Sequence, residues 1–461
     1  MTIARFLLAA AFLWLASCSG ETTPARPSVV LVIGDTLRAD ALSCAGGPEG
    51  LTPYVDRLAA EGVRFQDARS HAPWTLPSTA SILTSLHPLE HGAGGQVPRF
   101  TRMAEGVTTL TRSFRDAGYR THAIVNVTFL DPRAFGVTRD FETVDNQAFE
   151  NNVDVRPARA TTAAALKWIE EEAGDEPFFL LVHYFDPHCV YAPPTSFRER
   201  WAAPGDRATD WTFGTREQMV AIRSGQLVPT ADTIQRARRL YDGEVAYFDA
   251  EVGRLTDRLR ALRARESTVV ALTSDHGEEF LDHRGFEHGH TLFEELVRVP
   301  FVLNAPGRLA PAVVEDPARH IDLAPTLLEL CDLPVPAQFV GRSLVPLARG
   351  ESEAPRGTLA HGNFWRAPLT SWVSGGWKLI EEEGASPLLF DLVNDPDEQR
   401  DLSGEAADQL ERLQGELAAV RAGMAALRSG GSAELDPATR ARLEGLGYGG
   451  STHGAVADEP R

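Results

Sequence analysis

The chain has 461 residues, which suggests a large core with one or two appendages rather than one small domain. Its 43% hydrophobic and 24% charged residues are ordinary globular values, which excludes collagen-like, coiled-coil and wholly disordered chains. Acidic residues outnumber basic ones by 64 to 45, a net charge of −19, so no nucleic-acid partner is expected, because phosphate backbones require a basic footprint.

The first residues are typical of an export signal. An apolar run at 6–16 follows Arg5 and is too short to span a bilayer. Leu15-Ala16-Ser17-Cys18 is similar to the bacterial lipobox, in which the Cys is lipidated and becomes the new N-terminus. We expect a lipoprotein-type signal at 1–18 and a tether at 19–28. The protein would then be exported to the periplasm or cell surface and held at the outer membrane by its lipid alone. An ordinary cleaved signal is the alternative.

The body of the chain alternates apolar strands with helical stretches. Residues 28–34 form a continuous apolar run that ends in Gly, typical of a strand buried on both faces. Further strands are expected at 122–127, 177–184, 268–273 and 299–303, and helices at 53–61, 107–117, 160–172 and 236–265. This alternation predicts an α/β fold with a largely parallel sheet, whose chemistry lies beyond the carboxyl ends of the strands.

The last hundred residues have a different pattern of predicted strands and helices. Segments 372–382 and 388–392 predict a small antiparallel sheet, and 405–428 predicts a helix with Leu and Ala on one face. We therefore expect a catalytic domain, a small C-terminal α+β subdomain, and a helical tail with a disordered end, at 29–348, 349–404 and 405–461. The three cysteines after the signal are odd in number and far apart, so no disulfide framework is predicted. We expect Cys44, Cys189 and Cys331 to pack as small hydrophobic residues.

Four segments carry polar residues suited to catalysis, namely 32–40, 71–81, 183–188 and 273–290. They resemble the sulfatase family of the alkaline phosphatase superfamily, and the resemblance continues at 320–328, 341–344 and 389–398. It covers nearly the whole mature chain in the same order. The resemblance implies an alkaline phosphatase-like α/β sandwich and a hydrolase of sulfate or phosphate esters.

The residues themselves suggest a metal site. Asp35 and Asp275 each end an apolar strand, and carboxylates are hard ligands for divalent cations. His276 adds a nitrogen ligand, which moves the preference from calcium towards zinc or manganese. Thr75 lies where the resemblance places the nucleophile, and its hydroxyl needs a metal or a base for activation. We expect Asp35, Thr75, Asp275 and His276 to hold a divalent cation.

The sequence also departs from the family pattern. Sulfatases carry Cys or Ser at the nucleophile position and convert it to formylglycine, which is not expected from Thr75. Thr79 stands where that motif has Arg, and Thr36 stands where the family has its second metal-binding Asp. Asn126 and Thr128 replace the Lys-x-His residues that bind substrate in the family. The pattern instead resembles threonine-nucleophile branches of the superfamily, which include nucleotide phosphodiesterases and phosphoglycerol transferases.

The nucleophile also bears on the substrate. A sulfated formylglycine hydrate can expel sulfate by elimination, whereas a sulfated threonine has no such exit. A phosphothreonine can be hydrolysed by water that attacks phosphorus. Family resemblance therefore favours sulfate esters and Thr75 favours phosphate or phosphonate esters, of a small molecule, a glycan or a lipid. Group transfer to an alcohol, and a degenerate protein that binds sulfated or phosphorylated glycans without turnover, are the alternatives.

Several histidines are candidates for proton transfer. The resemblance implies that His188 or His290 protonates the leaving group, with His290 preferred over His288. Asp186, His188 and His290 could instead hold a second metal. His183 is interpreted as a core histidine with its hydrogen bonds satisfied.

Overall fold

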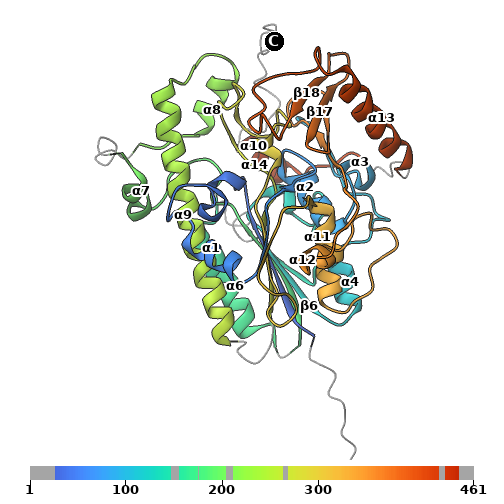
Figure 1. Ribbon diagram of the computed structural model, residues 1–461. Coiled ribbons are helices and arrows are strands. Elements are labelled where there is room, and N and C mark those ends of the chain that lie inside the picture. The colour runs from blue at the N-terminus through green and yellow to red at the C-terminus, as the bar shows by residue number, and fades with distance from the viewer. Residues whose placement is uncertain are drawn as a thin grey trace, which may run out of the picture.

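The computed structural model describes six stretches of the chain, residues 26–146, 155–174, 176–203, 211–262, 268–424 and 431–445 (Figure 1). The predicted signal and nearly all of the tether lie outside them, as does the predicted disordered end. No helix within these stretches is long and apolar enough to cross a bilayer.

An eight-stranded sheet forms the centre of the protein, in the strand order β13-β2-β12-β9-β1-β8-β6-β7. Strand β1 (Ser28–Gly34) pairs in parallel with β8 (Phe178–Tyr184) on one side and β9 (Thr268–Ser274) on the other. The other strands are β2 (Val63–Phe65), β6 (Arg120–Ile124), β7 (Thr143–Asp145), β12 (Phe301–Asn304) and β13 (Ala312–Val314). Since β12 alone in this sheet is antiparallel to the strands on both sides, the prediction of a largely parallel sheet is confirmed.

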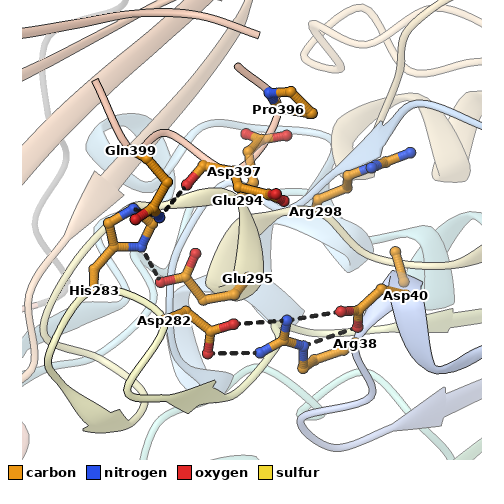
Figure 2. A pocket seen from close by; sticks show the side chains of 11 residues that line it. Arg38, Asp40, Asp282, His283, Glu294, Glu295, Arg298, Pro396, Asp397 and Gln399 are labelled. Atoms are coloured by element: carbon orange, nitrogen blue, oxygen red, sulfur yellow. Dashed lines mark hydrogen bonds and ion pairs between the residues drawn. The ribbon is translucent and has the colours of Figure 1, made fainter. Parts of the chain in front are cut away.

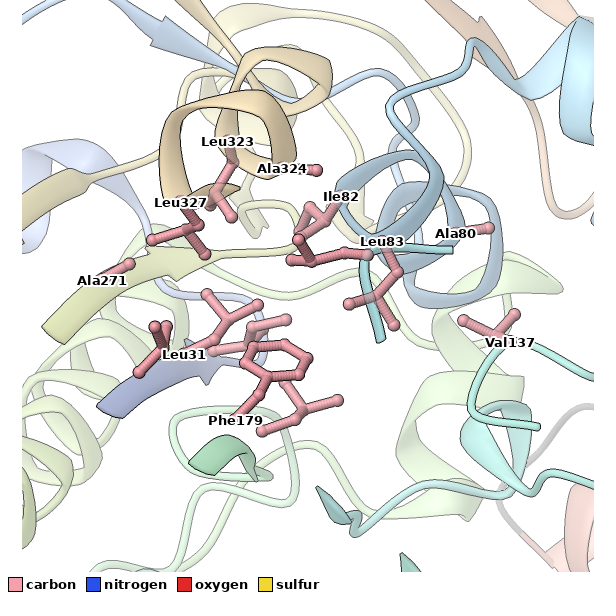
Figure 3. Packing of buried hydrophobic residues seen from close by; sticks show 14 of the residues in the cluster. Leu31, Ala80, Ile82, Leu83, Val137, Phe179, Ala271, Leu323, Ala324 and Leu327 are labelled. Atoms are coloured by element: carbon pink, nitrogen blue, oxygen red, sulfur yellow. The ribbon is translucent and has the colours of Figure 1, made fainter. Parts of the chain in front are cut away.

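Helices cover both faces of this sheet because the side chains of β1 alternate between them (Figure 1). Leu31 and its same-face neighbours pack under α2 (Thr75–Thr84), α4 (Leu110–Asp116) and α11 (His320–Leu330), where Figure 3 shows Leu31 below Leu327 and Leu83. Val30 and Val32 pack on the opposite face against α1 (Pro53–Ala60), α6 (Ala158–Glu171) and α9 (Ala231–Leu262). Leu31 has no exposed surface, so replacing it with Ala would cost roughly 2–5 kcal/mol.

Local interactions explain where two predicted helices begin. The helix expected at 107–117 begins at Leu110, because the Thr109 side chain caps it by accepting a hydrogen bond from the Arg112 N–H. The long helix expected at 236–265 begins earlier, at Ala231. Its buried Ile234 extends the apolar face of α9 towards the N-terminus.

A second, antiparallel sheet lies on the C-terminal side, as predicted. It consists of β15 (Thr358–Gly362), β16 (Leu369–Ser374), β17 (Trp377–Glu382) and β18 (Leu388–Asp391). Helix α13 (Ala407–Gly423) packs Leu413 and Leu417 onto Trp372 and Leu379 of this sheet. The helical part of the expected tail is therefore part of the C-terminal subdomain.

Buried charges join this subdomain to the central domain. Lys378 of β17 has no exposed surface, and its Nζ lies 2.9 Å from both Glu294 and Glu398. Burial opposes the charge of Lys378, but the two carboxylates raise its pKa above the ordinary value. Glu294 is also bound by the buried Arg69, the last residue of β3 (Ala68–Arg69) in the central domain.

Shorter elements complete the fold. The short strands are β3 (Ala68–Arg69), β4 (Gly94–Gln96), β5 (Arg99–Thr101), β10 (Glu279–Phe280), β11 (Phe286–Glu287) and β14 (Ala318–Arg319). The short helices are η1 (Ala39–Ala41), η2 (Ser43–Ala45), α3 (Pro88–His91), η3 (Thr128–Leu130), α7 (Thr195–Trp201), α8 (Arg216–Arg223), α10 (Glu294–Val297), α12 (Val345–Ala348) and α14 (Pro437–Gly445). All three cysteines in the described stretches are free; Cys189 and Cys331 are buried as expected, and Cys44 is half-buried.

Candidate active site

The carboxyl ends of three adjacent strands meet at one point. Asp35 follows β1, Asp275 follows β9, and His183 is the second-last residue of β8. One ligand atom from each of these three side chains lies within 4.8 Å of the others, the one such group of three among the described residues. This is the sheet edge where parallel α/β folds hold their ligands.

The donor atoms of this group are buried without hydrogen-bond partners. Both carboxylate oxygens of Asp35 and Oδ2 of Asp275 have none, and neither ring nitrogen of His183 has one in another residue. Burial, together with the charges of Asp275 and Glu278, holds the pKa of Asp35 well above its ordinary value. Because buried polar groups are almost always paired, these orphaned oxygens and nitrogens fit a divalent cation.

The tautomer of His276 points to the same conclusion. Its Nδ1 donates to the carbonyl of Gly277 at 2.9 Å, which leaves the lone pair on Nε2. That Nε2 lies 3.6 Å from Asp35 Oδ1 and 3.5 Å from Asp275 Oδ2. A lone pair facing two carboxylates is unfavourable unless a cation lies between them.

Thr75 is brought to this cluster by helix α2. It is the first residue of the helix, and its Oγ1 lies 3.4 Å from His276 Nε2. Ser78, one turn later, donates from its hydroxyl to the carbonyl of Asp275 at 2.5 Å and ties the helix to the metal-site loop. The structure thus brings together Asp35, Thr75, Asp275 and His276, the four ligands expected from the sequence. The N-terminus of a helix also favours negative charge at this position.

His183 was missed by the sequence analysis. It is buried as expected, but the expectation of satisfied hydrogen bonds is wrong, and the ring lies 3.5 Å from Asp35 Oδ2. Burial lowers its pKa to about 4, so the ring is neutral near pH 7 and can act as a ligand. The alternation of side chains along β8 could have indicated this. His183 lies on the same face of the strand as Phe179 and Leu181, which is the face that α2 covers.

The structure does not bring together the three residues considered for a second metal. The carboxyl of Asp186 hydrogen-bonds Glu244 of α9, and the pKa of Asp186 is raised to about 6, chiefly by burial. His290 places its Nε2 2.7 Å from Glu279. His188 donates from Nδ1 to the carbonyl of Cys189 at 2.5 Å, and burial lowers its pKa to about 3.

His288 has the position that the sequence analysis preferred for His290. Its Nδ1 donates to Glu278 Oε1 at 2.9 Å, and Glu278 Oε2 accepts from the hydroxyl of Tyr191 at 2.8 Å. The His288 ring lies between His276 and His188, with centroid separations of 4.5 and 4.9 Å. A carboxylate that holds one ring nitrogen fixes the tautomer and direction of the other.

A narrow cavity opens onto Thr75 and His288. Its other lining residues are Trp74, Phe129, Glu287, Phe364 and Trp365. Two of these, Phe364 and Trp365, follow β15 and so come from the C-terminal part of the chain. None of these lining residues is Lys or Arg.

The residues that replace the family's charged groups are neutral and buried. The hydroxyls of Thr36, Thr79 and Thr128 have no hydrogen-bond partner. Asn126 donates from Nδ2 to Thr161 at 2.9 Å and to the carbonyl of His183 at 2.5 Å. Asn126 therefore braces the strand that carries His183.

A second cleft, shown in Figure 2, contains charged groups that are paired with one another. Arg38 lies between Asp40 and Asp282, with closest ion-pair distances of 2.7 and 3.0 Å. Nδ1 of His283 lies 2.8 Å from Oε1 of Glu295. These carboxylates have cationic partners, unlike Asp35, and so do not call for a metal.

The fold and this site define a hydrolase that acts on ester bonds. Residues 27–333 match the family model Sulfatase, and residues 282–422 match the model described as N-sulphoglucosamine sulphohydrolase, C-terminal. The chain belongs to the sulfatase family.

Relatives and solved structures agree with this assignment. The chain is 26% identical over 424 residues to the uncharacterized sulfatase YidJ of Escherichia coli (strain K12), covering 82% of this chain and 83% of that protein. It is 25% identical over 427 residues to arylsulfatase K of Canis lupus familiaris, covering 81% and 78%.

The fold is shared with a phosphonate monoester hydrolase of Agrobacterium radiobacter, at a TM-score of 0.71 and 22% identity over 86% of this chain and 96% of that one. It is also shared with a protein solved with its substrate D-glucosamine-2-N,6-O-disulfate, at a TM-score of 0.70 and 21% identity over 86% and 97%.

Proposed function

We propose that the protein is a metal-dependent hydrolase in which Thr75 attacks phosphate or phosphonate esters in preference to sulfate esters. One observation carries the proposal. The hydroxyl of Thr75 lies 3.4 Å from His276 Nε2, beside buried carboxylate oxygens of Asp35 and Asp275 that have no hydrogen-bond partner. A protein that only bound glycans would gain nothing from such a hydroxyl.

Asp35, Asp275, His276 and Thr75 would hold the cation, with His183 as a further candidate ligand. When bound, the cation neutralises the charge of the ester and lowers the pKa of the threonine hydroxyl. The mixture of carboxylate and imidazole ligands favours zinc or manganese over calcium.

In the proposed reaction the oxygen of Thr75 forms a bond to phosphorus while the bond to the leaving oxygen breaks. The N-terminus of α2 stabilises negative charge on the phosphoryl oxygens. His288 lines the cavity with Thr75, and its Nδ1 is held by Glu278, so its Nε2 is placed to exchange a proton with the reacting groups. Water then attacks phosphorus, breaks the bond to Thr75 and releases the free hydroxyl.

The choice of phosphorus over sulfur follows from the nucleophile. A sulfated threonine lacks the second hydroxyl through which a formylglycine hydrate eliminates sulfate. The likeness in fold to a phosphonate monoester hydrolase supports the phosphorus chemistry. Sulfate ester hydrolysis is the second candidate, favoured by the family and by relatives named as sulfatases.

The test is a paired assay on the purified protein. Aryl sulfate, aryl phosphate and aryl phosphodiester are offered after metal stripping and after return of zinc, manganese or calcium. We expect metal-dependent cleavage of a phosphorus ester, abolished in Thr75→Ala and partly kept in Thr75→Ser. Thr84→Ala removes a hydroxyl from the other end of the same helix and is the matched control. Sulfate cleavage that survives Thr75→Ala would contradict the proposal.

We also propose that the protein is exported and lipid-anchored through Cys18. The segment Leu15-Ala16-Ser17-Cys18 supports this. Wild-type protein is then expected in the membrane fraction of a bacterial host, and Cys18→Ala in the soluble fraction. The same distribution for both proteins would argue for an ordinary cleaved signal.

A further inference from the structure

The cavity beside Thr75 is closed in the structure. It holds about 10 Å³, which is room for one water molecule and not for an ester. Part of its lining must therefore move before a substrate can reach Thr75. We propose that helix α8 (Arg216–Arg223) moves outwards, and that Arg223 at its end then binds the negatively charged oxygens of the ester. This inference rests on the proposed function, to which it adds a substrate-binding residue.

Most of the lining is fixed in the core. Trp74, Phe129 and Phe364 are buried. The ring centroid of Trp74 lies 4.8 Å from that of Phe364 and 5.3 Å from that of Phe129. Glu287 belongs to β11, which pairs with β10, and Trp365 is half-buried. These last two residues are the part of the lining that α8 contacts.

Arg223 connects α8 to this part of the lining. Its Nη1 lies 2.5 Å from Oε2 of Glu287, and its guanidinium carbon lies 4.4 Å from the centroid of the Trp365 ring. Its charge also acts on the cavity. Burial, and then the charges of His276 and other cationic groups including Arg223, hold the pKa of His288 well below its ordinary value.

Helix α8 is lightly attached to the rest of the protein. The structure describes all of this helix, and Met219 is its one buried residue. A segment with few buried apolar contacts opens at a small cost in free energy. Gly214 and Gly225 flank the helix with φ angles of 95° and 72°, which glycine adopts freely. The hydroxyl of Thr215 accepts the N–H of Gln218 at 3.3 Å, so the helix carries its own cap and can move intact.

The ester needs a cation that the closed lining does not supply. No lining residue is Lys or Arg, and Thr79, Asn126 and Thr128 stand where the family has charged residues. A guanidinium can donate two parallel hydrogen bonds to a phosphoryl or sulfuryl group. When α8 moves outwards, Arg223 leaves Glu287, and the carboxylate that α8 no longer covers is hydrated. Glu287 therefore competes with the ester for Arg223.

The test uses the opposite effects expected for the two partners of this ion pair. Calorimetric titration measures the binding of inorganic phosphate and of sulfate to the metal-loaded protein. Arg223→Ala should weaken binding by about 10- to 100-fold, the range for a hydrogen bond to a charged group, and Arg223→Lys should weaken it less. Glu287→Gln should strengthen binding by about 2- to 5-fold, because it releases Arg223 from a partly exposed ion pair.

A double-mutant cycle separates this competition from simple repulsion of the anion by Glu287. In the Arg223→Ala background, Glu287→Gln should have no effect, whereas repulsion through space would persist. Arg216→Ala is the matched control, because Arg216 is exposed at the other end of α8, and it should leave binding unchanged. Weaker binding in Glu287→Gln, a gain that persists without Arg223, or an equal loss in Arg216→Ala overturns the inference.

Hydrogen exchange tests the movement. The amides of residues 216–223 should exchange about tenfold faster than those of residues 240–249, in the buried part of α9, and faster still in Glu287→Gln. Equal protection of the two helices overturns the inference, as does a wild-type protein that binds neither anion. A protein that binds an anion through Arg223 but cleaves no phosphorus ester would refute the proposed function and leave this inference standing.

Discussion

Replacing Asp35 with Asn should stabilise the metal-free protein and destabilise the metal-loaded one. Both carboxylate oxygens of Asp35 are buried without partners, and Asp275 and Glu278 add negative charge nearby. An unsatisfied buried polar group costs about 1–3 kcal/mol, and a charged one more. Removing the charge should therefore raise the free energy of unfolding of the metal-free protein by roughly 2 kcal/mol.

The metal-loaded protein should respond with the opposite sign. A cation present at a hundred times its dissociation constant stabilises the native state by about 2.7 kcal/mol, and Asp35→Asn should lose most of that. Because the variant keeps its gain of roughly 2 kcal/mol, the net loss with metal present is about 0.7 kcal/mol. In a domain of this size 1 kcal/mol moves Tm by roughly 2 °C, so Tm should rise by about 4 °C in chelator and fall by about 1–2 °C with metal. Differential scanning calorimetry in chelator and in added zinc or manganese measures both.

Asp322→Asn is the matched control. Asp322 is also fully buried, but its carboxylate is paired with Arg319 at 2.8 Å and Arg356 at 3.3 Å. Its replacement should lower Tm in both conditions, because it leaves buried guanidinium groups without their partner. A lower Tm for Asp35→Asn in chelator would refute the reasoning, since the Asp35 carboxylate would then be stabilised by the protein alone.

Three further predictions concern positioning, pH and a helix cap. Glu278→Gln should lower kcat about tenfold with little change in KM, because the carboxylate holds His288 without lining the cavity; an equal rise in KM would contradict this. Burial opposes a charge on His283, but the hydrogen bond to Glu295 raises its pKa to about 9. The stability it contributes is complete below pH 6.5 and lost as pH rises through 9, so wild type should exceed His283→Gln by about 1–3 kcal/mol at pH 6 in urea titrations, and by nothing at pH 10. Asp249 accepts the N–H groups of Tyr54 and Val55 at the start of α1, so Asp249→Ala should cost about 1–2 kcal/mol in the same assay; a loss below 0.5 kcal/mol would exclude the cap.

The sequence was informative where the signal is local. Residues 28–34 predict a buried strand that ends at Asp35, and the run at 268–273 does the same for Asp275, because a strand buried on both faces is apolar at every position. The parallel sheet then brings both carboxylates to one edge.

The residues that were missed depend on contacts across the fold. His183 needed the register of β8 against β1, which pairs it with Ile33. His288 was not separable from His290 because the choice depends on which of two glutamates each ring meets, Glu278 or Glu279. Trp365 lies far along the chain from Thr75, and only the folded structure shows that the two line one cavity.

The contribution of Phe364 and Trp365 to the cavity has a consequence for how the protein matures. The chain is synthesised from its N-terminus, so Asp35 and Thr75 leave the ribosome long before Phe364 and Trp365, which line the cavity beside Thr75. A nascent or truncated chain that ends near residue 333, where the match to the catalytic family model ends, contains every candidate metal ligand but lacks Trp365 and Lys378. The cavity beside Thr75 is therefore completed at the end of synthesis, when the C-terminal sheet docks on a centre whose candidate ligands were made first.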